Sequence, residues 1–550
     1  MNPSEHVAGV IIATLVERGV RDVVLAPGSR SAPLAYALWR VRDRVRLHVR
    51  IDERSAGFTA LGLAKVTGLP VPVITTSGTA VGNLMPAVME AWNARVPLFV
   101  ISADRPSTMI NTGANQTTEQ VGLFGRHVRA AARLSARDAE PQAWSYGVDR
   151  LVQLASGVRG SVPGPVHLNV ELVDPLTPAG GSPSGGLLPA VSSPTLGPAM
   201  VGPRIMGEST KINCMPGTVV VAGDLPVAQG RAVADLAAQA AVPLLAEPSS
   251  NARHGRTAIS TYRLLLGTGL AERIDQVIMV GHPTLSRPVQ RLLARDDVRL
   301  VVVAPEAEWE SPAARADQVV GSVALAGAGD PAWLAAWQQA DDRLLERLAA
   351  DPGTLGTASA VIGSLGEESA LVLGSSNPIR DADLVRFTTR ARVYANRGLA
   401  GIDGTIATAV GVALADQERA TTAFMGDLTF VHDSNGLVIG PEEPRPEHLR
   451  IVVANDDGGS IFATLEYGAE GFADSFERLF ATPHRTDLSA LAAASGATFH
   501  RVEDQDQLPD LLATPPVGIE VVEVVTDRTD RHTQASRWSD LATAAVADAD

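Results

Sequence analysis

The feature that most constrains the fold of this chain is the alternation of short runs of β-branched residues with longer Ala- and Leu-rich stretches. Apolar runs of this length, bounded by turn residues, are typical of strands that are buried on both faces of a parallel sheet. The longer stretches between them provide the crossover helices that parallel strands require. The sequence therefore predicts an α/β protein built from doubly wound parallel sheets.

The predicted strands fall into three groups, and 550 residues are too many for one hydrophobic core. The first group has strands over 22–26, 71–76, 98–103 and 166–173, the second over 218–223, 243–246, 276–281 and 299–304, and the third over 371–374, 392–395, 422–425, 450–454 and 519–525. A stretch rich in Pro, Gly and Ser over 175–203 is a predicted linker, and a predicted helix over 331–350 ends before Pro352 and Gly353. We therefore expect domains over residues 1–180, 204–350 and 355–550.

Charge and cysteine content exclude several functional classes. The formal net charge is -15, so the bulk positive field of a nucleic-acid-binding or membrane-surface protein is absent. Cys214 is the only cysteine, which excludes an intrachain disulfide and a Cys-based metal cluster. The apolar run over 7–16 is too short to span a bilayer and predicts a first helix with Ser4 as its N-cap, ending at Gly19. We expect a cytoplasmic protein without membrane insertion.

Two acidic segments follow neighbouring strands of the third group. The segment GDLT at 426–429 follows one strand, and NDDGG at 455–459 follows the next, about thirty residues later. Ligands of open α/β sheets bind outside the carboxyl ends of the strands, where Asp427 and Asp456 can converge. Two carboxylates suit a divalent cation that bridges a diphosphate. A single Asp after a strand is usually only a helix cap, so the pair carries the prediction.

Several arginines follow predicted strands instead of lying on helical faces: Arg30, Arg105, Arg287, Arg380 and Arg397. Any one of them alone is more often part of a surface ion pair. Together, in an acidic protein, they indicate bidentate binding of substrate carboxylates. The charged segment IDER at 51–54 is, by itself, only a solvated cluster.

With these segments identified, the chain resembles the 2-succinyl-5-enolpyruvyl-6-hydroxy-3-cyclohexene-1-carboxylate (SEPHCHC) synthases, thiamine-diphosphate enzymes of menaquinone biosynthesis. The segments that carry the resemblance extend from Ala26 to Phe462 in family order and are APGSRSAPL, RIDERSAGF, TTSGTAVGNLMPAVMEA, SADRP, GANQTTEQ, GPVHLNVEL, ANRGLAGIDG, GDLTFVHD and NDDGGSIF. The middle third resembles the family only weakly. The resemblance implies an N-terminal pyrimidine-binding domain, a central cofactor-free domain and a C-terminal diphosphate- and metal-binding domain.

The resemblance also implies a reaction and the roles of individual residues. In this family, thiamine diphosphate with Mg²⁺ or Mn²⁺ decarboxylates 2-oxoglutarate, and the succinyl carbanion equivalent undergoes a Stetter-like 1,4-addition to isochorismate. Glu53 matches the glutamate that hydrogen-bonds the cofactor's aminopyrimidine and so promotes deprotonation of the thiazolium carbon. The metal ligands that the resemblance implies are Asp427, Asp456 and the carbonyl group of Gly458. The other implied cofactor contacts are Pro27, Thr79, Ile402, which bends the cofactor, Leu428, Thr429 and Ile461. The implied substrate contacts are Ser29, Arg30, Arg105, Asn115, Gln116, Arg287, Ser376, Arg380, Arg397 and Phe462.

The family further implies a homodimer, or a dimer of dimers, with active sites at the dimer interface. Two positions depart from the family pattern. Asp456 and Asp457 stand where many members have asparagine, which adds negative charge beside the diphosphate and bears on the preferred metal. Ser286 stands where some members have lysine beside the arginine, so a substrate contact is lost or rerouted there.

Three alternative functions are compatible with parts of the sequence. Another thiamine-diphosphate carboligase, such as an acetolactate synthase-like enzyme, or a simple 2-oxo-acid decarboxylase would share Glu53, Asp427 and Asp456, but does not call for five loop arginines. A non-catalytic cofactor-binding paralogue is disfavoured because Glu53 and the acidic turn over 455–459, the metal turn, are both present. The sequence supports a dinucleotide-binding Rossmann protein even less, since the first predicted strand is not followed by a Gly-x-Gly-x-x-Gly turn.

Overall fold

The computed structural model describes residues 2–138, 140–158, 161–178, 188, 209–306, 308–350, 353–528 and 531–547. The chain divides into two compact units. The first unit comprises Met1–Arg204, Gly398–Gln417 and Asp433–Pro446, and the second comprises Ile205–Arg397, Glu418–His432 and Glu447–Asp550. The predicted linker over 175–203 lies outside the described residues, apart from 175–178 and 188.

The first unit contains a parallel sheet of six strands in the order β2-β1-β3-β4-β6-β5. Its strands are β1 Asp22–Leu25, β2 Arg46–Val49, β3 Val71–Thr75, β4 Leu98–Asp104, β5 Ala130–Ser135 and β6 Val166–Glu171. The four interior strands are buried at every position, as their apolar runs predicted. The edge strands β2 and β5 are half exposed and were not predicted as strands.

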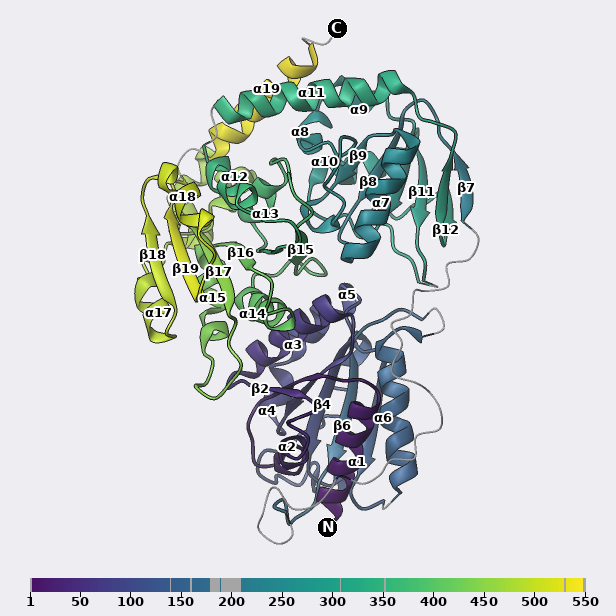
Figure 1. Ribbon diagram of the computed structural model, residues 1–550, viewed down its shortest axis with the longest axis vertical. Helices are drawn as coiled ribbons and strands as arrows, with labels where there is room; N and C mark the ends of the chain where they lie inside the picture. The colour runs from purple at the N-terminus through teal and green to yellow at the C-terminus, as the bar shows by residue number, and fades with distance from the viewer. Residues whose placement is uncertain are drawn as a thin grey trace. The chain divides into compact units, whose positions relative to one another are not determined.

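Helices cover both faces of this sheet. The helices of the unit are α1 Pro3–Glu17, α2 Ala32–Trp39, α3 Glu53–Thr67, α4 Thr79–Gly82, α5 Met85–Asn93, α6 Pro141–Ala155 and α14 Thr405–Ala415, with the 3₁₀ turns η1 Ser107–Met109, η2 Gly125–His127 and η5 Ser434–Leu437. Residues of α1, α2 and α6 form one core with the sheet, and α1 and α6 lie side by side (Figure 1). Helix α14 packs along α3, where Gly62 and Gly411 allow close approach, because a Cβ at Gly62 would collide with the carbonyl oxygen of Thr408.

The prediction that Ser4 caps the first helix is wrong. Asn2 is the N-cap, and its side chain accepts a hydrogen bond of 2.8 Å from the backbone N–H of Glu5, whose side chain accepts from the N–H of Asn2 in return. This reciprocal capping box satisfies two free N–H groups of the first turn. Ser4 lies inside the helix, and its hydroxyl bonds the backbone of Val173 instead.

The second unit contains two larger parallel sheets and a two-stranded ribbon. The five-stranded sheet has the order β12-β11-β10-β8-β9, the ribbon pairs β13 with β7, and the six-stranded sheet has the order β15-β14-β16-β17-β19-β18. The strands are β7 Thr210–Asn213, β8 Thr218–Ala222, β9 Leu244–Ala246, β10 Gln276–Val280, β11 Arg299–Val303, β12 Gln318–Val320, β13 Val323–Ala326, β14 Ala370–Leu373, β15 Arg392–Ala395, β16 Thr421–Gly426, β17 His448–Asn455, β18 Thr498–Val502 and β19 Gly518–Val525. The three larger sheets of the molecule confirm the three predicted groups of strands, whereas the domain boundaries stay a prediction.

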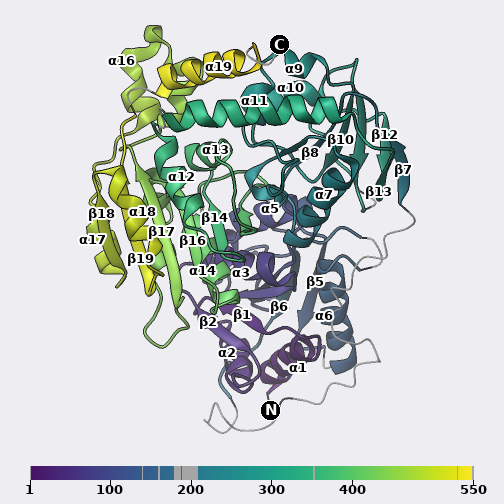
Figure 2. The ribbon, with the colours of Figure 1, turned by 45° about the horizontal axis from the view of Figure 1, so that its top comes forward.

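Two long helices close the core of the five-stranded sheet. Helix α11 Pro331–Ala350 has the predicted bounds, and α19 Arg531–Ala547 lies alongside it (Figures 1 and 2). Trp333 and Trp337 of α11 and Trp538 of α19 are buried in one hydrophobic cluster, with the first two rings in edge-to-face contact at 5.6 Å. The two helices thus seal one face of the sheet.

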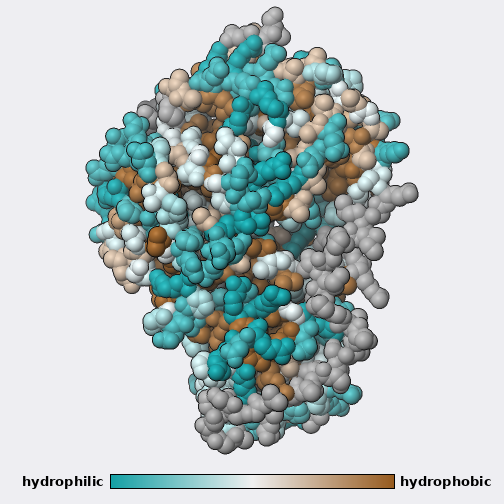
Figure 3. All heavy atoms as spheres, in the orientation of Figure 1, coloured by the Kyte–Doolittle hydropathy of each residue, from teal (hydrophilic) through white to brown (hydrophobic). Residues whose placement is uncertain are grey.

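The remaining helices of the second unit are short. They are α7 Val227–Ala240, α8 Tyr262–Leu265, α9 Gly269–Glu272, α10 Arg287–Leu293, α12 Leu355–Gly363, α13 Asn377–Ala382, α15 Asp427–His432, α16 Ala473–Phe476, α17 Leu488–Ala494 and α18 Leu508–Ala513, with the 3₁₀ turns η4 Pro248–Ser250, η6 Ser460–Thr464, η7 Glu466–Gly468, η8 Glu470–Phe472 and η10 Gln505–Gln507 and a π-helical turn η9 Glu477–Ala481. Within the described part of the chain, no helix is long and apolar enough to cross a membrane. Hydrophilic and hydrophobic residues are interspersed on the face shown in Figure 3.

Candidate active site

Glu53 is the first residue of α3, just beyond the carboxyl end of β2. Asp52 caps this helix and accepts hydrogen bonds from the backbone N–H groups of Arg54 at 2.8 Å and Ser55 at 3.2 Å. Its other carboxylate oxygen accepts from the Asn435 amide at 3.0 Å. The Glu53 carboxylate accepts a hydrogen bond of 3.2 Å from the Asn83 amide and is half exposed. The cap therefore fixes the backbone from which Glu53 projects.

A buried aspartate joins α3 to α14, the helix that follows Ile402. Asp433 accepts a hydrogen bond of 2.9 Å from the backbone N–H of Ala407 in the first turn of α14. Its other oxygen lies 3.6 Å from the guanidinium of Arg54, the neighbour of Glu53. Burial raises the pKa of Asp433 to about 7. The elements that carry Glu53 and Ile402 are therefore joined within one compact unit, by a residue that the sequence did not single out.

Two of the predicted substrate arginines lie at strand ends of the first sheet. Arg105, after β4, donates to the Ser77 hydroxyl at 2.7 Å and to the Gln116 carbonyl at 2.8 Å. Burial and the charge of Arg105 lower the pKa of Arg30, so the two guanidiniums act on each other electrostatically. An anionic group would relieve this repulsion. Four other predicted ligand contacts of this unit are exposed at loop or helix-terminal positions: Pro27, Ser29, Thr79 and Asn115.

A buried polar network lies beneath these loops; its residues belong to the segments GANQTTEQ, GPVHLNVEL and SADRP, but the sequence analysis assigned them no role. The side chain of Gln120 is fully buried, and its amide oxygen accepts from the N–H of Gly78 at 2.9 Å. Its amide nitrogen donates to Asn169 at 2.9 Å, and Asn169 donates to Asp104 at 3.0 Å. The network thereby connects the turn before Thr79 with the end of β4.

In the second unit, Asp427 follows β16 and Asp456 follows β17, as predicted. The Oδ2 atom of Asp427 accepts from the Gly458 N–H at 2.7 Å and from Nε2 of His484 at 2.9 Å. Burial, together with the charge of Asp427, raises the pKa of Asp456 to about 6, which places the two carboxylates in each other's field. A Cβ added at Gly426 would meet no other atom within 4 Å, so there is open space next to Asp427.

These residues fit a divalent cation with a diphosphate. Carboxylate and carbonyl oxygens are the ligands that Mg²⁺ prefers, and Mg²⁺ sites commonly combine one or two carboxylates with phosphate oxygens of a bound molecule. Among the described residues, no group of three or more His, Cys, Asp or Glu side chains could hold a metal ion. A cation held by Asp427 and Asp456 would therefore need oxygens from a bound diphosphate.

Asp457, which follows the predicted metal ligand Asp456, has a defined structural use. Its carboxylate accepts from the backbone N–H groups of His484 at 3.1 Å and Arg485 at 2.9 Å. Arg528 donates to the backbone carbonyls of Asp456, at 2.9 Å, and of Asp457. The negative charge of Asp457 is thus stabilised by two N–H donors of the neighbouring loop.

The other predicted cofactor and pocket residues of the second unit lie close to the metal turn in sequence and structure. Leu428 and Thr429 belong to the first turn of α15, and Thr429 is buried. Ile461 and Phe462 belong to η6, and the Phe462 ring lies 5.9 Å from that of Phe480. This aromatic contact provides an apolar wall next to the acidic turn.

The predicted substrate arginines of the second unit differ in their surroundings. Burial lowers the pKa of Arg380 to about 10, and the charges of Arg263 and Arg397 contribute. Arg380 donates to the carbonyl of Ser376 at 2.8 Å, and Ser376 has a positive φ of 76°. Arg397 donates to the Thr284 hydroxyl at 3.1 Å. The structure thus brings Arg380 and Arg397 into each other's field.

Arg287 and Ser286 differ from Arg380 and Arg397 in their exposure and hydrogen bonding. Arg287 begins α10, is 65% exposed and pairs with Glu466 at 3.0 Å. Ser286 is buried, and its hydroxyl has no hydrogen-bond partner within the described ranges. The buried Glu247, which the sequence did not single out, accepts from the N–H of Leu285 at 2.7 Å, and burial raises the pKa of Glu247 to about 8. Glu247 therefore supports the loop that precedes Arg287.

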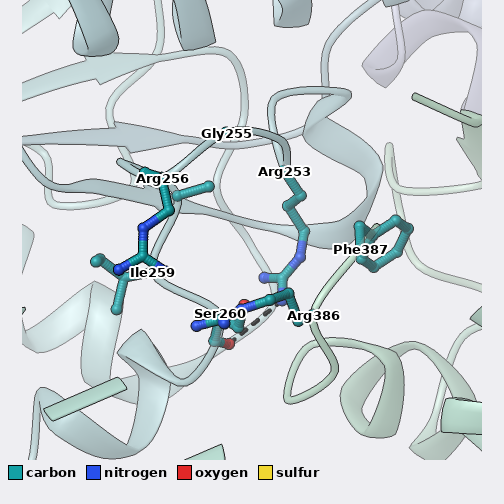
Figure 4. A pocket seen from close by; sticks show the side chains of 8 residues that line it. Arg253, Gly255, Arg256, Ile259, Ser260, Arg386 and Phe387 are labelled. Atoms are coloured by element: carbon teal, nitrogen blue, oxygen red, sulfur yellow. Dashed lines mark hydrogen bonds between the residues drawn. The ribbon is translucent and has the colours of Figure 1, made fainter. Parts of the chain in front are cut away.

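The second unit contains a cavity of about 110 Å³ whose lining differs from the residues described so far (Figure 4). It is lined by Arg253, Arg256, Arg386 and Phe387, among others. Arg253 donates to the carbonyl oxygens of Ala246 at 2.7 Å and Ser260 at 3.3 Å, so its role is structural. The cavity contains none of the predicted site residues.

The predicted site residues are divided between the two compact units. Those in the first unit are Pro27, Ser29, Arg30, Glu53, Thr79, Arg105, Asn115, Gln116 and Ile402, and those in the second are Arg287, Ser376, Arg380, Arg397, Asp427, Leu428, Thr429, Asp456, Gly458, Ile461 and Phe462. Apart from Ile402, which precedes α14, the members of each unit lie at the carboxyl ends of its own strands or in the loops and helices that follow them.

Family models of known proteins match an N-terminal and a C-terminal part of the chain. Residues 5–123 match the model of the thiamine pyrophosphate enzyme N-terminal TPP binding domain, and residues 377–515 match that of the C-terminal TPP binding domain. The chain is 46% identical over 569 residues, covering 100% of both sequences, to a protein of Kineococcus radiotolerans named 2-succinyl-5-enolpyruvyl-6-hydroxy-3-cyclohexene-1-carboxylate synthase. It is 48% identical over 546 residues, 95% of each sequence, to a protein of the same name from a Nocardioides species.

A solved structure shows the same fold at low identity. The benzoylformate decarboxylase of Polynucleobacter necessarius superimposes with a TM-score of 0.64 at 18% sequence identity, covering 96% of this chain and 99% of the other. At this identity the similarity supports the fold alone.

Proposed function

Because the chain belongs to the SEPHCHC synthase family of thiamine-pyrophosphate enzymes, we propose that it decarboxylates 2-oxoglutarate and adds the remaining succinyl unit to isochorismate in menaquinone biosynthesis. The observation that carries the proposal is the full-length identity of 46% to a synthase of that name. It is supported by Glu53 at a capped helix N-terminus and by Asp427 and Asp456, which act on each other electrostatically.

The carbon balance of the reaction follows from the product name. Loss of CO₂ from the five-carbon 2-oxoglutarate leaves the four-carbon succinyl group. A new carbon–carbon bond then joins the former keto carbon of that group to the ring of isochorismate, while the ring double bond takes up the electron pair and a proton. Both substrates carry two carboxylates, so the site must hold several negative charges.

The cofactor side of the proposal assigns roles to residues of both units. Thiamine diphosphate, when bound, supplies a thiazolium carbon that attacks the keto group and accepts the electrons released by decarboxylation. Asp427, Asp456 and the Gly458 carbonyl would hold Mg²⁺ or Mn²⁺ against its diphosphate, near Leu428 and Thr429. Glu53 would hold a proton at the pyrimidine ring nitrogen. The remaining contacts would come from Pro27, Thr79, Ile402 and Ile461.

The arginines and their polar neighbours would bind the substrate carboxylates. Arg380 is half-buried, and its charged form is disfavoured by the charges of Arg263 and Arg397. A substrate carboxylate would therefore gain Arg380 and the buried Arg397 as partners. Arg30 and Arg105 form the corresponding pair in the first unit. The other proposed contacts are Ser29, Asn115, Gln116, Arg287, Ser376 and Phe462.

Assembly and location belong to the same proposal. The family resemblance supports a homodimer or a dimer of dimers in which each active site combines Glu53 of one chain with Asp427 and Asp456 of another. The net charge of -15 supports small anionic substrates held by local arginines, without nucleic-acid binding, and the proposed location is the cytoplasm.

The test is a direct comparison of substrates. The purified protein is incubated with thiamine diphosphate and Mg²⁺, and with either 2-oxoglutarate and isochorismate or pyruvate alone, and products are detected by mass. We expect the succinyl adduct of isochorismate from the first mixture and no acetolactate from the second. Acetolactate without the succinyl adduct would support an acetolactate synthase-like carboligase instead.

A further inference from the structure

His484 lies outside every motif that the sequence analysis singled out, yet it contacts the proposed metal ligand Asp427. Its Nε2 atom is 2.9 Å from Oδ2 of Asp427, and its side chain is 13% exposed. The N–H of Gly458 donates to the same oxygen at 2.7 Å. Both donors therefore contact the same carboxylate oxygen and together restrict the orientation of the Asp427 side chain.

The hydrogen bond at Nδ1 of His484 determines which ring nitrogen carries the hydrogen. The backbone N–H of Thr486 donates to Nδ1 at 2.9 Å, so Nδ1 is the acceptor and Nε2 carries the hydrogen. An N–H group at Nε2 can donate to the Asp427 carboxylate. Since both ring nitrogens are engaged, His484 is not itself a ligand of a cation that prefers oxygen.

The loop that carries His484 is held by Asp457. The Asp457 carboxylate accepts from the N–H groups of His484 at 3.1 Å and Arg485 at 2.9 Å. Asp457 has a positive φ of 52°, and its carbonyl accepts a hydrogen bond from Arg528, which also bonds the Asp456 carbonyl at 2.9 Å. Asp457 of the metal turn therefore binds the backbone at 484–485, and the His484 side chain in turn contacts Asp427.

We propose that Asp457 and His484 are positioning residues for the metal ligand Asp427, with Asp457 acting through His484. The inference rests on the proposed metal site and deepens it. Residues that hydrogen-bond a metal-ligating carboxylate fix its orientation, and their loss typically weakens metal affinity by about 10- to 100-fold. Asp457 would thus influence the cation through the 484–485 loop and would not be a ligand itself.

The test measures Mn²⁺ binding by electron paramagnetic resonance in the presence of thiamine diphosphate, which does not depend on turnover. His484→Ala is expected to raise the Kd for Mn²⁺ by about 10- to 100-fold. His484→Gln, which keeps a side-chain N–H donor, should recover most of this loss. Asp457→Ala should weaken Mn²⁺ binding in the same direction, whereas Asp457→Asn keeps an oxygen acceptor and should bind as the wild type does.

The double variant Asp457→Ala/His484→Ala distinguishes positioning from a general structural effect. If Asp457 acts through His484, the double variant binds Mn²⁺ no more weakly than His484→Ala alone, since residues in one network do not add. His500→Ala is the matched control, because His500 pairs with Glu520 at 3.3 Å on β18, away from the metal turn, and should leave Mn²⁺ affinity unchanged.

Three outcomes separate the inference from the metal site itself. Asp427→Ala should abolish tight Mn²⁺ binding, and a wild-type Kd in that variant would overturn the proposed metal site. If Asp427→Ala fails to bind but His484→Ala and Asp457→Ala both bind as the wild type does, the positioning role is wrong. Fully additive losses in the double variant would overturn the claim that Asp457 acts through His484. Circular dichroism of each variant verifies that the chain is folded.

Discussion

At the scale of single residues, the adjacent carboxylates of Asp52 and Glu53 differ in their hydrogen bonds and therefore in their roles. Asp52 accepts two backbone N–H groups of α3 and the Asn435 amide, so it is committed to the helix end. Glu53, the next residue, accepts from the Asn83 amide and stays half exposed. Glu53 can therefore exchange its partner for a ligand at little structural cost.

Glu53→Gln is expected to keep the fold and the cofactor affinity but to lose most turnover. An amide cannot share a proton with the pyrimidine nitrogen, and losing an acid-base contact of this kind typically costs about 10² to 10⁴ in rate. The measurement is kcat at saturating thiamine diphosphate. Near-normal kcat in the folded, cofactor-saturated variant would remove Glu53 from the mechanism.

Arg397→Ala or Arg380→Ala is expected to weaken binding of a dicarboxylic substrate much more than binding of thiamine diphosphate. Removing one partner of a desolvated charge pair costs roughly 2 to 5 kcal/mol. Separate calorimetric titrations of substrate and cofactor decide the question. Arg256→Ala serves as the control, because Arg256 is 69% exposed and pairs with Asp342. A loss confined to thiamine diphosphate would assign these arginines to the diphosphate.

At the scale of elements, burial separates the strands that the sequence predicts from those it does not. Interior strands such as β4 and β10 are buried at every position, so their apolar runs are unbroken. The edge strands β5 and β18 mix exposed and buried residues, and β12 has only three residues, so hydrophobicity alone does not reveal them. The edge strands β9 and β15, which are mostly buried, were predicted, so it is exposure and not edge position alone that hides a strand in the sequence.

The site divides in a similar way between predictable and unpredictable parts. Motifs at strand ends, such as those of Asp427 and Asp456, are visible because strand and turn are adjacent in the sequence. His484, Gln120 and Asp433 act through contacts with residues that are distant in the chain, and no local pattern encodes such contacts. Their roles emerge only from the fold.

Asp52→Ala tests the link between a helix cap and catalysis. Loss of an N-cap typically costs about 1 kcal/mol of folding stability, and here it also frees the backbone that carries Glu53. Asn2→Ala is the matched control, because Asn2 caps α1, which lies in the same unit and, like α3, has 15 residues. Thermal unfolding should show similar destabilisation in both variants. Only Asp52→Ala should lower kcat, and equal kcat values in the two variants would contradict the link.

At the scale of the whole molecule, the proposed site residues lie in two compact units of one chain. Glu53 and Ile402 belong to the first unit, and Asp427 and Asp456 belong to the second. Neither unit alone has the complete set that the reaction needs. The family resemblance supports an assembly in which two chains complete each other's sites.

Mixed assemblies test this sharing of sites. When Glu53→Ala chains are co-refolded with Asp427→Ala chains, a mixed dimer with shared sites has one site with both lesions and one intact site. Random pairing makes half the dimers mixed, so roughly a quarter of wild-type activity should return under a closed two-fold arrangement. If proven mixing leaves activity at the level of the separate variants, each site is built within one chain.

The most direct measurement of the proposed reaction follows the carbon atoms of 2-oxoglutarate. The protein is incubated with isochorismate, thiamine diphosphate, Mg²⁺ and 2-oxoglutarate that carries ¹³C either at C1 or at C2, and the product and the released CO₂ are analysed by mass. The proposed function predicts that the C1 label leaves as CO₂, that the C2 label appears in the succinyl adduct, and that Glu53→Gln suppresses both. An adduct that retains the C1 label, or CO₂ release without any adduct, would contradict it.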